Sequence, residues 1–202
     1  EPVYLFGGAY PPLPLRSKFF LAPRVEVDRV ITPGTAGFPG FEDLEIEVVD
    51  LAGHTLGQVG VAVDGVLFCA DAVIAPEFIA KHGVPLNAHL GKTLETYDCL
   101  EGRKERRFLP SHGQLVHNLG PLVASNRERV NQVAGRIMEE LDRPRTMEDI
   151  TASLCECFGI EITSLGQHCL MQLTLMAYLS HLLDQNRIQA VYRHGRQLFL
   201  RR

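Results

Sequence analysis

Short apolar runs separated by Gly and Pro fill the first part of the chain and predict β-strands. From residue 44 onward apolar and acidic residues alternate, and the run becomes continuously apolar near residue 49. This pattern is typical of a strand that begins half exposed and then enters a core. Strands are predicted at residues 25–31, 44–49, 59–63, 66–69 and 107–109. The third and fourth should form a hairpin, because the turn dipeptide Asp64-Gly65 joins them.

Helical patterns appear between these strands and dominate the end of the chain. Apolar residues at Leu94, Tyr97 and Leu100 follow the i, i+3, i+6 spacing of a helix packed on a sheet, over residues 92–104. After Gly120-Pro121 capping boxes are expected at Ser125 with Glu128 and at Thr146 with Asp149. Helices are therefore predicted over residues 126–141, 147–158 and 164–184, followed by two short strands within residues 187–202 that turn at His194-Gly195.

The change of composition at residue 120 predicts two domains, residues 1–120 and residues 121–202. The first combines strands with a helix. The second has three helices followed by a β-hairpin, an order that resembles a winged helix. We therefore expect an α+β protein.

Composition and charge favour a soluble globular protein in the cytoplasm. Apolar residues make up 46% of the chain and charged residues 22%, which is ordinary for such proteins. The apolar runs are shorter than the roughly 18 residues that span a bilayer, so no membrane segment is expected. The 5 cysteines are odd in number and follow no pattern, which favours a reducing compartment over a disulfide framework. A net charge of −4 gives little support for non-specific nucleic-acid binding.

Three residues of metal-ligand type lie beside small residues at the ends of predicted strands: His54, Asp71 and His112. If Val63 pairs with Val66 in the hairpin, His54 and Asp71 emerge at the same end of the same sheet. Imidazole nitrogen and carboxylate oxygen are common zinc ligands. We therefore predict that these three residues form a metal site.

The other histidines lack this setting and are expected on the surface or on helix faces. Two of them, His89 and His117, are also candidates to line a pocket. The full set of remaining histidines is His82, His89, His117, His168, His181 and His194.

The motifs Gly-His-Thr-Leu-Gly at 53–57, Phe-Cys-Ala-Asp at 68–71 and Leu-Pro-Ser-His-Gly at 109–113 resemble the metallo-β-lactamase-fold hydrolase superfamily. The resemblance covers roughly residues 1–120. Ala70 and Cys69 depart mildly from the family, which usually has Gly and often has Thr at these places. The family signature H-x-H-x-D-H, which supplies most of the metal ligands, is absent from the 202 residues. The resemblance thus implies the second half of an αββα metallo-β-lactamase sandwich followed by a winged-helix domain, and we expect a fragment of a longer protein.

The same resemblance implies that His54, Asp71 and His112 are the catalytic residues as well as metal ligands. His54 would complete the ligand set of one metal ion, Asp71 would bridge two ions, and His112 would bind the second. Two zinc ions are expected in the full-length protein, with iron or manganese as alternatives. A metal-activated hydroxide would attack an ester, thioester or phosphodiester of a small-molecule substrate. Because three ligands are too few for two ions, the chain alone is expected to bind metal weakly and to be inactive.

Two other functions stay open. The predicted helix at 164–184 has no Lys or Arg and carries a wide apolar stripe, which favours packing against the hydrolase domain or a homodimer over reading nucleic acid. The Arg-rich segment 187–202 keeps an RNA-processing nuclease or another nucleic-acid-binding function as an alternative. A metal-free scaffold protein is a third. The motifs are shared by several hydrolase types, so they leave the scissile bond undetermined.

Overall fold

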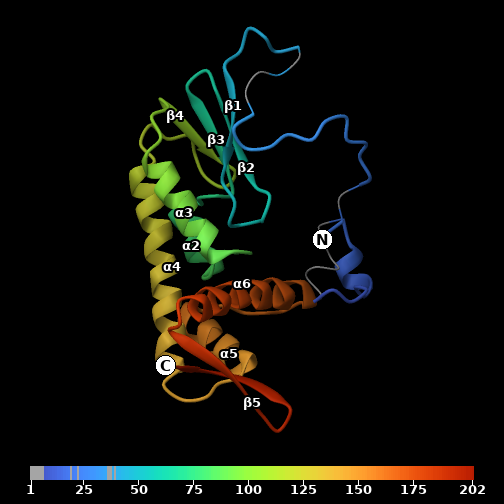
Figure 1. The fold of residues 1–202 in the computed structure, drawn as a ribbon, viewed down its shortest axis with the longest axis vertical. Helices are drawn as coiled ribbons and strands as arrows, with labels where there is room; N and C mark the ends of the chain where they lie inside the picture. Colours follow the sequence, from blue (N-terminus) through green and yellow to red (C-terminus); the bar gives the residue numbers. More distant parts are fainter. Residues whose placement is uncertain (1–6, 19, 22, 36–37, 39) are drawn as a thin grey trace.

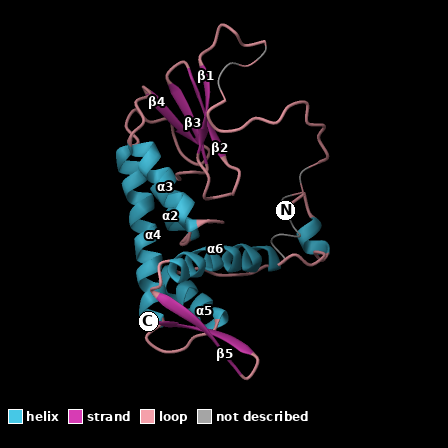
Figure 2. Cartoon of the chain, viewed as in Figure 1, coloured by secondary structure: helices cyan, strands magenta, loops and turns pink. Residues whose placement is uncertain are grey.

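The computed structural model of the chain describes residues 7–18, 20–21, 23–35, 38 and 40–202. Helices and strands are both present, so the expected α+β class is confirmed (Figure 2). In chain order the elements are the 3-10 helix η1 (Leu13–Arg16), β1 (Ile46–Asp50), β2 (Val59–Val63), β3 (Val66–Ala70), α2 (Pro76–His82), α3 (Leu90–Glu101), β4 (Arg107–Pro110), α4 (Gly120–Glu140), α5 (Met147–Phe158), α6 (Leu165–Asp184), β5 (Ile188–Arg193) and β6 (Arg196–Arg201).

Four strands form one sheet in the order β1-β2-β3-β4, and β5 and β6 form a separate hairpin. Val63 lies opposite Val66, as predicted. The turn between them is tight because Asp64 and Gly65 both have positive φ, 49° and 73°. The β1–β2 and β2–β3 pairs are antiparallel and the β3–β4 pair is parallel. The carboxyl ends of β1, β3 and β4 therefore lie at the same edge of the sheet.

The two faces of this sheet differ in burial. Ala62, Leu67 and Cys69 are buried in the same core as residues of α3 and α4. On the opposite face Val61 is half-buried and Phe68 is 43% exposed. Helices thus cover one face of the sheet, while the other face presents apolar side chains.

The long helix α4 connects the sheet to the C-terminal helices, and α6 extends away from the lower part of α4, nearly perpendicular to it (Figure 1). Helix α4 contacts α2, α3 and α5. A continuous hydrophobic core includes Leu67 of the sheet, Leu100 of α3, Val133 of α4, Leu154 of α5 and Leu175 of α6. The predicted boundary near residue 120 coincides with the start of α4. The division into two domains and the winged-helix comparison stay predictions, although the three helices and the hairpin occur in the expected order.

The predicted starts of α5 and α6 are confirmed, and that of α4 is wrong. Thr146 and Asp149 form the expected capping box, and the Ser164 side chain caps α6. The predicted start of the preceding helix near Ser125 was wrong, because α4 begins at Gly120. Pro121 lies in the first turn, where its missing N–H costs nothing. Ser125 lies inside the helix and its hydroxyl donates to the carbonyl of Leu122.

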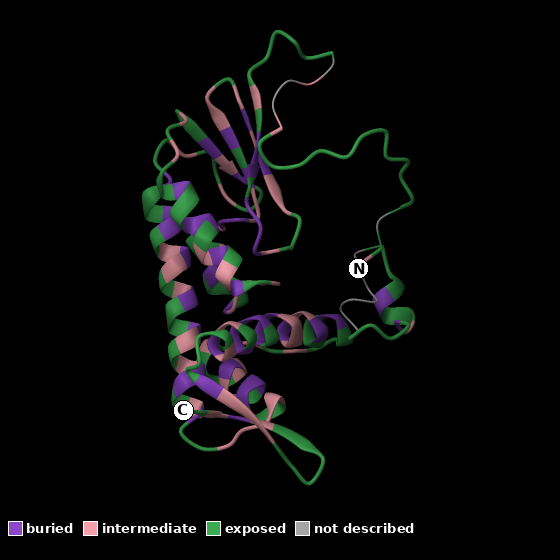
Figure 3. Ribbon diagram, viewed as in Figure 1, coloured by how far each residue is buried: buried purple, intermediate pink, exposed green. Residues whose placement is uncertain are grey.

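The predicted strand at residues 25–31 was also wrong. These residues are irregular in the structure, and Val25, Val27 and Val30 are exposed (Figure 3). A strand needs a neighbour that satisfies its backbone hydrogen bonds. Within the described residues no strand pairs with this segment.

Helix α6 uses its wide apolar surface inside the chain. It contacts α3, α5, β5 and η1. Tyr178, Leu179 and Leu182 are almost completely buried in the shared core. The dimer expected through residues 164–184 stays a prediction. Most of the apolar surface of α6 is already covered within the chain, so little of it is left for a partner.

None of the helices in the described part of the chain is long and apolar enough to cross a membrane. All five cysteines are free. Burial raises the pKa of the Cys69 thiol to about 12, which keeps it protonated at neutral pH.

The carboxylate of Glu140 joins α4 to α5 and to the loop between them. It accepts hydrogen bonds from the Ser153 hydroxyl at 2.9 Å and from the guanidinium groups of Arg136 at 2.6 Å and Arg145 at 2.7 Å. The Ser153 hydrogen bond and the charges of the two arginines lower the pKa of Glu140. The ionised carboxylate therefore stabilises the folded state.

We predict that Glu140→Gln lowers the free energy of unfolding by about 1–3 kcal/mol at pH 7, because charge-assisted hydrogen bonds are lost. The folded-state pKa lies below that of an unfolded glutamate. The contribution is therefore present above about pH 4.3 and is lost as the pH falls through the lower folded value. Urea unfolding from pH 7 to pH 3.5 measures it. Glu156→Gln, at an exposed position of α5, is the control. A difference between wild type and Glu140→Gln that stays constant with pH would contradict the prediction.

Candidate functional site

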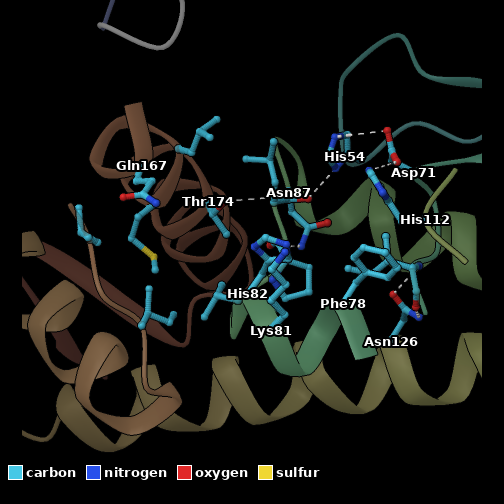
Figure 4. Close-up of a pocket in the computed structure, with 18 of the residues that line it drawn as sticks. His54, Asp71, Phe78, Lys81, His82, Asn87, His112, Asn126, Gln167 and Thr174 are labelled. Carbon is cyan, nitrogen blue, oxygen red and sulfur yellow. Dashed lines mark hydrogen bonds and ion pairs between the residues drawn. The ribbon is translucent and has the colours of Figure 1, made fainter. Parts of the chain in front are cut away.

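The three predicted site residues lie together at the edge where β1, β3 and β4 end. His54 is in the loop after β1, Asp71 directly follows β3, and His112 follows β4. The Nε2 atom of His54 lies 3.9 Å from Oδ2 of Asp71, and Nε2 of His112 lies 3.5 Å from Oδ1 (Figure 4). All three side chains are partly exposed. The structure therefore places each imidazole at a different oxygen of one carboxylate.

Backbone contacts set the orientation of His54. Its Nδ1 atom lies 3.0 Å from the carbonyl oxygen of Leu86. In the tautomer with the proton on Nδ1, this nitrogen donates to Leu86 and leaves Nε2 unprotonated toward Asp71. The next residue, Asn87, donates its backbone N–H to the Thr174 hydroxyl of α6 at 3.4 Å. A helix from the end of the chain thus supports the loop that orients His54.

His112 is held by its backbone and by an aromatic contact. Its carbonyl accepts from the N–H of Ala75 at 2.9 Å, and the N–H of Ser111 donates to the carbonyl of Ala70 at 2.9 Å. The ring of Phe78 in α2 lies 5.3 Å from the His112 ring, centroid to centroid. The loops carrying Asp71 and His112 are therefore tied to each other.

Asp71 has an incompletely satisfied carboxylate. Its Oδ1 atom is buried and has no hydrogen-bond partner among the described residues. Buried oxygens are normally paired, so such an atom suits a cation. Within the same part of the chain no group of three or more His, Cys, Asp or Glu side chains forms a ready metal site. Each oxygen of Asp71 instead has one imidazole nearby. Each side of the carboxylate therefore offers two possible metal-ligand atoms, one oxygen and one nitrogen.

Gly53 is required by the close approach of its loop to α3. Its φ is +146°, and an added Cβ would lie 2.7 Å from the Cα atom of Thr93. Its carbonyl accepts from the N–H groups of Ala88 and His89 at 2.8 Å and 3.0 Å. Glycine at this position thus meets two needs, a backbone with positive φ and close packing on α3.

A cavity of about 560 Å³ opens beside the three residues and extends to the C-terminal helices (Figure 4). One wall is formed by α2 and the loop after it, and the other by α6 and the loop before it. The lining residues that the sequence did not reveal include Phe78, Lys81, His82, Leu86, Ile162, Leu170, Met171 and Thr174. Only tertiary packing brings α6 here, so no local pattern could have identified this wall.

The two histidines considered as pocket residues do not line this cavity. The Nδ1 atom of His89 accepts from the backbone N–H of Lys92 and so caps α3. The Nδ1 atom of His117 lies 3.1 Å from the Arg106 carbonyl on the surface. His82, expected on the surface, is exposed but lines the cavity.

Comparison with known proteins places the chain in a family. The model of the metallo-beta-lactamase superfamily matches residues 3–112, more than half of the chain, so the chain belongs to this superfamily. None of the curated proteins matches it. The resemblance inferred from the three motifs is therefore confirmed at the level of the superfamily.

Two solved structures show the same fold. The chain is 15% identical to a metallo-beta-lactamase family protein from Thermus thermophilus, with a TM-score of 0.73 over 99% of this chain and 62% of that chain. It is 17% identical to a beta-lactamase domain protein from Burkholderia ambifaria, with a TM-score of 0.72 over 86% of this chain and 52% of that chain. The chain thus spans less than two thirds of either relative. The likeness to the Thermus protein extends through the C-terminal helices and hairpin.

We predict that Gly53→Ala lowers the free energy of unfolding by about 2–4 kcal/mol, because the new methyl group meets the backbone of α3 and the φ angle disfavours alanine. Gly57→Ala is the matched control, since no atom lies within 4 Å of its added Cβ and its φ is unstrained. The control should change stability by less than about 0.5 kcal/mol. Chemical denaturation of the three proteins compares them, and equal effects of both substitutions would contradict the packing argument.

Proposed function

We propose that the chain carries part of the metal centre of a metal-dependent hydrolase. The observation that supports this most directly is the carboxylate of Asp71. It has an imidazole nitrogen near each oxygen, at 3.9 Å and 3.5 Å, and its Oδ1 atom is buried with no hydrogen-bond partner in the described part of the chain. Asp71 would hold metal through its carboxylate oxygens, with His54 and His112 as the nitrogen donors beside them.

Zinc fits the donor set best. Carboxylate oxygen and neutral imidazole bind zinc at about 2.0–2.2 Å. Iron and manganese accept the same donors, so they are alternatives. The hydrogen bond from His54 to the Leu86 carbonyl is the kind of outer contact that orients a metal-binding histidine.

A bound metal ion supplies Lewis-acid activation of water and polarises the bond to be cleaved. The residues of the chain have the other tasks. Leu86 fixes the ring of His54, Phe78 packs on the ring of His112, and the cavity next to Asp71 positions a small-molecule substrate. An ester, thioester or phosphodiester is the expected type of substrate.

The donors in this chain are too few for tight binding. Two zinc ions with four ligands each need more than two histidines and one bridging aspartate. We therefore infer that the chain alone binds zinc weakly and does not turn over substrate. The superfamily motif H-x-H-x-D-H, which supplies most of the ligands, is absent from these 202 residues.

Zinc titration of the metal-free chain tests this proposal. We expect a dissociation constant weaker than about 1 μM, since the ligand set is partial. Asp71→Asn and His112→Ala should each weaken binding at least about tenfold. His168→Ala, at an exposed position of α6, is the control and should leave the titration unchanged.

Two results would count against the proposal in different ways. If the Asp71 and His112 variants titrate like the wild type, these residues are not the ligands. If elemental analysis finds one or more zinc equivalents per chain after dialysis against a mild chelator, the inference of weak binding is wrong.

A further inference from the structure

The cavity beside Asp71 is mostly apolar along its length. From the site end it passes the loop after α2, with Val84, Pro85 and Leu86, and reaches Leu170 and Met171 of α6 (Figure 4). Its volume of about 560 Å³ lies within the range of small-molecule sites. A ligand at Asp71 would therefore extend against α6.

Two buried asparagines that line this cavity, Asn87 and Asn126, are already paired. Asn87 donates its backbone N–H to the Thr174 hydroxyl and accepts from the hydroxyl of Thr93 through its side-chain oxygen. The side-chain amide of Asn126 donates to the carbonyl of Ile74 at 2.8 Å and accepts from the N–H of that same residue. A polar ligand group would find few free partners here, whereas an apolar group displaces only water.

The charges at the cavity do not suit a nucleic acid. Lys81 and Glu161 both line it and are exposed, so the lining includes one lysine and one glutamate of opposite charge. The other basic side chains in the lining are the histidines His54, His82 and His112, and Asp71 is a second acidic group. Affinity for a phosphodiester backbone rests on several Lys or Arg contacts. An acyl group needs none.

We propose that this cavity holds the acyl chain of an ester or thioester substrate, with the acyl carbonyl at Asp71 and the chain against α6. This assignment rests on the proposed hydrolase function and selects one class of substrate from it. In the reaction the oxygen of water bonds to the acyl carbon, and the bond from this carbon to the leaving oxygen or sulfur breaks. One proton of the water passes to the leaving group, so the products are a carboxylic acid and an alcohol or thiol.

Binding of neutral alkan-1-ols to the metal-free chain tests the cavity independently of catalysis. Octan-1-ol should bind at least about tenfold more tightly than butan-1-ol in calorimetric titrations, because each methylene removed from water adds a factor of about four. An alcohol is suitable because, unlike a fatty acid, it brings no negative charge to Asp71.

Leu170→Glu places a carboxylate in the wall of the cavity and should weaken octan-1-ol binding at least about tenfold. Leu165→Glu makes the same change at an exposed position of α6 outside the cavity and should have no effect. Ile162→Glu, in the loop before α6, is a second variant with the same expected loss. Circular dichroism checks that each variant is folded.

The outcomes separate the two proposals. If zinc binds as expected but octan-1-ol binds no better than butan-1-ol, or equally well to Leu170→Glu, the acyl assignment is overturned and the hydrolase proposal stands. It is also overturned if a dinucleotide binds more tightly than octan-1-ol and Leu170→Glu weakens that binding. If octan-1-ol binds as expected while the Asp71 variant titrates zinc like the wild type, the cavity assignment stands and the hydrolase proposal fails.

Discussion

The close contact between Gly53 and Thr93 connects the candidate site to the rest of the molecule. Because Gly53 has no side chain, its loop can lie directly on α3, where its carbonyl accepts from Ala88 and His89. The hydroxyl of Thr93 then donates to the side chain of Asn87, and Asn87 donates to Thr174 of α6. One uninterrupted series of contacts therefore runs from the loop of His54 to the C-terminal part of the chain.

Helix α6 consequently serves three roles at once. Its buried side chains, such as Tyr178 and Leu182, belong to the core shared with α3 and α4. Its Thr174 hydroxyl supports the loop that orients His54, and its Leu170 and Met171 form a wall of the cavity. The segment that the sequence marks as a separate helical domain is thus physically part of the candidate site. This arrangement explains how a change in one helix could alter both the orientation of a metal ligand and the shape of the substrate pocket.

Features with local causes were predictable from the sequence. The register of the β2–β3 hairpin follows from the turn at Asp64-Gly65, and the start of α5 follows from the Thr146 capping box. The convergence of His54, Asp71 and His112 was also predictable, because strand ends on one edge of a sheet are a consequence of pairing direction. Features that depend on distant partners were not. Among the described residues the apolar segment 25–31 lacks a strand beside it, and nothing near Leu170 in the sequence indicates that it lies close to Asp71.

The outer face of the four-stranded sheet has a consequence for the behaviour of the chain in solution. Phe68 is 43% exposed there, beside the half-buried Val61, on a surface that no helix of the described chain covers. Apolar patches of this kind attract one another, and two such sheets can stack face to face at about 10 Å. Self-association that strengthens with concentration and weakens on cooling would therefore arise first from this surface. Self-association through the exposed strands would be independent of a dimer formed through α6.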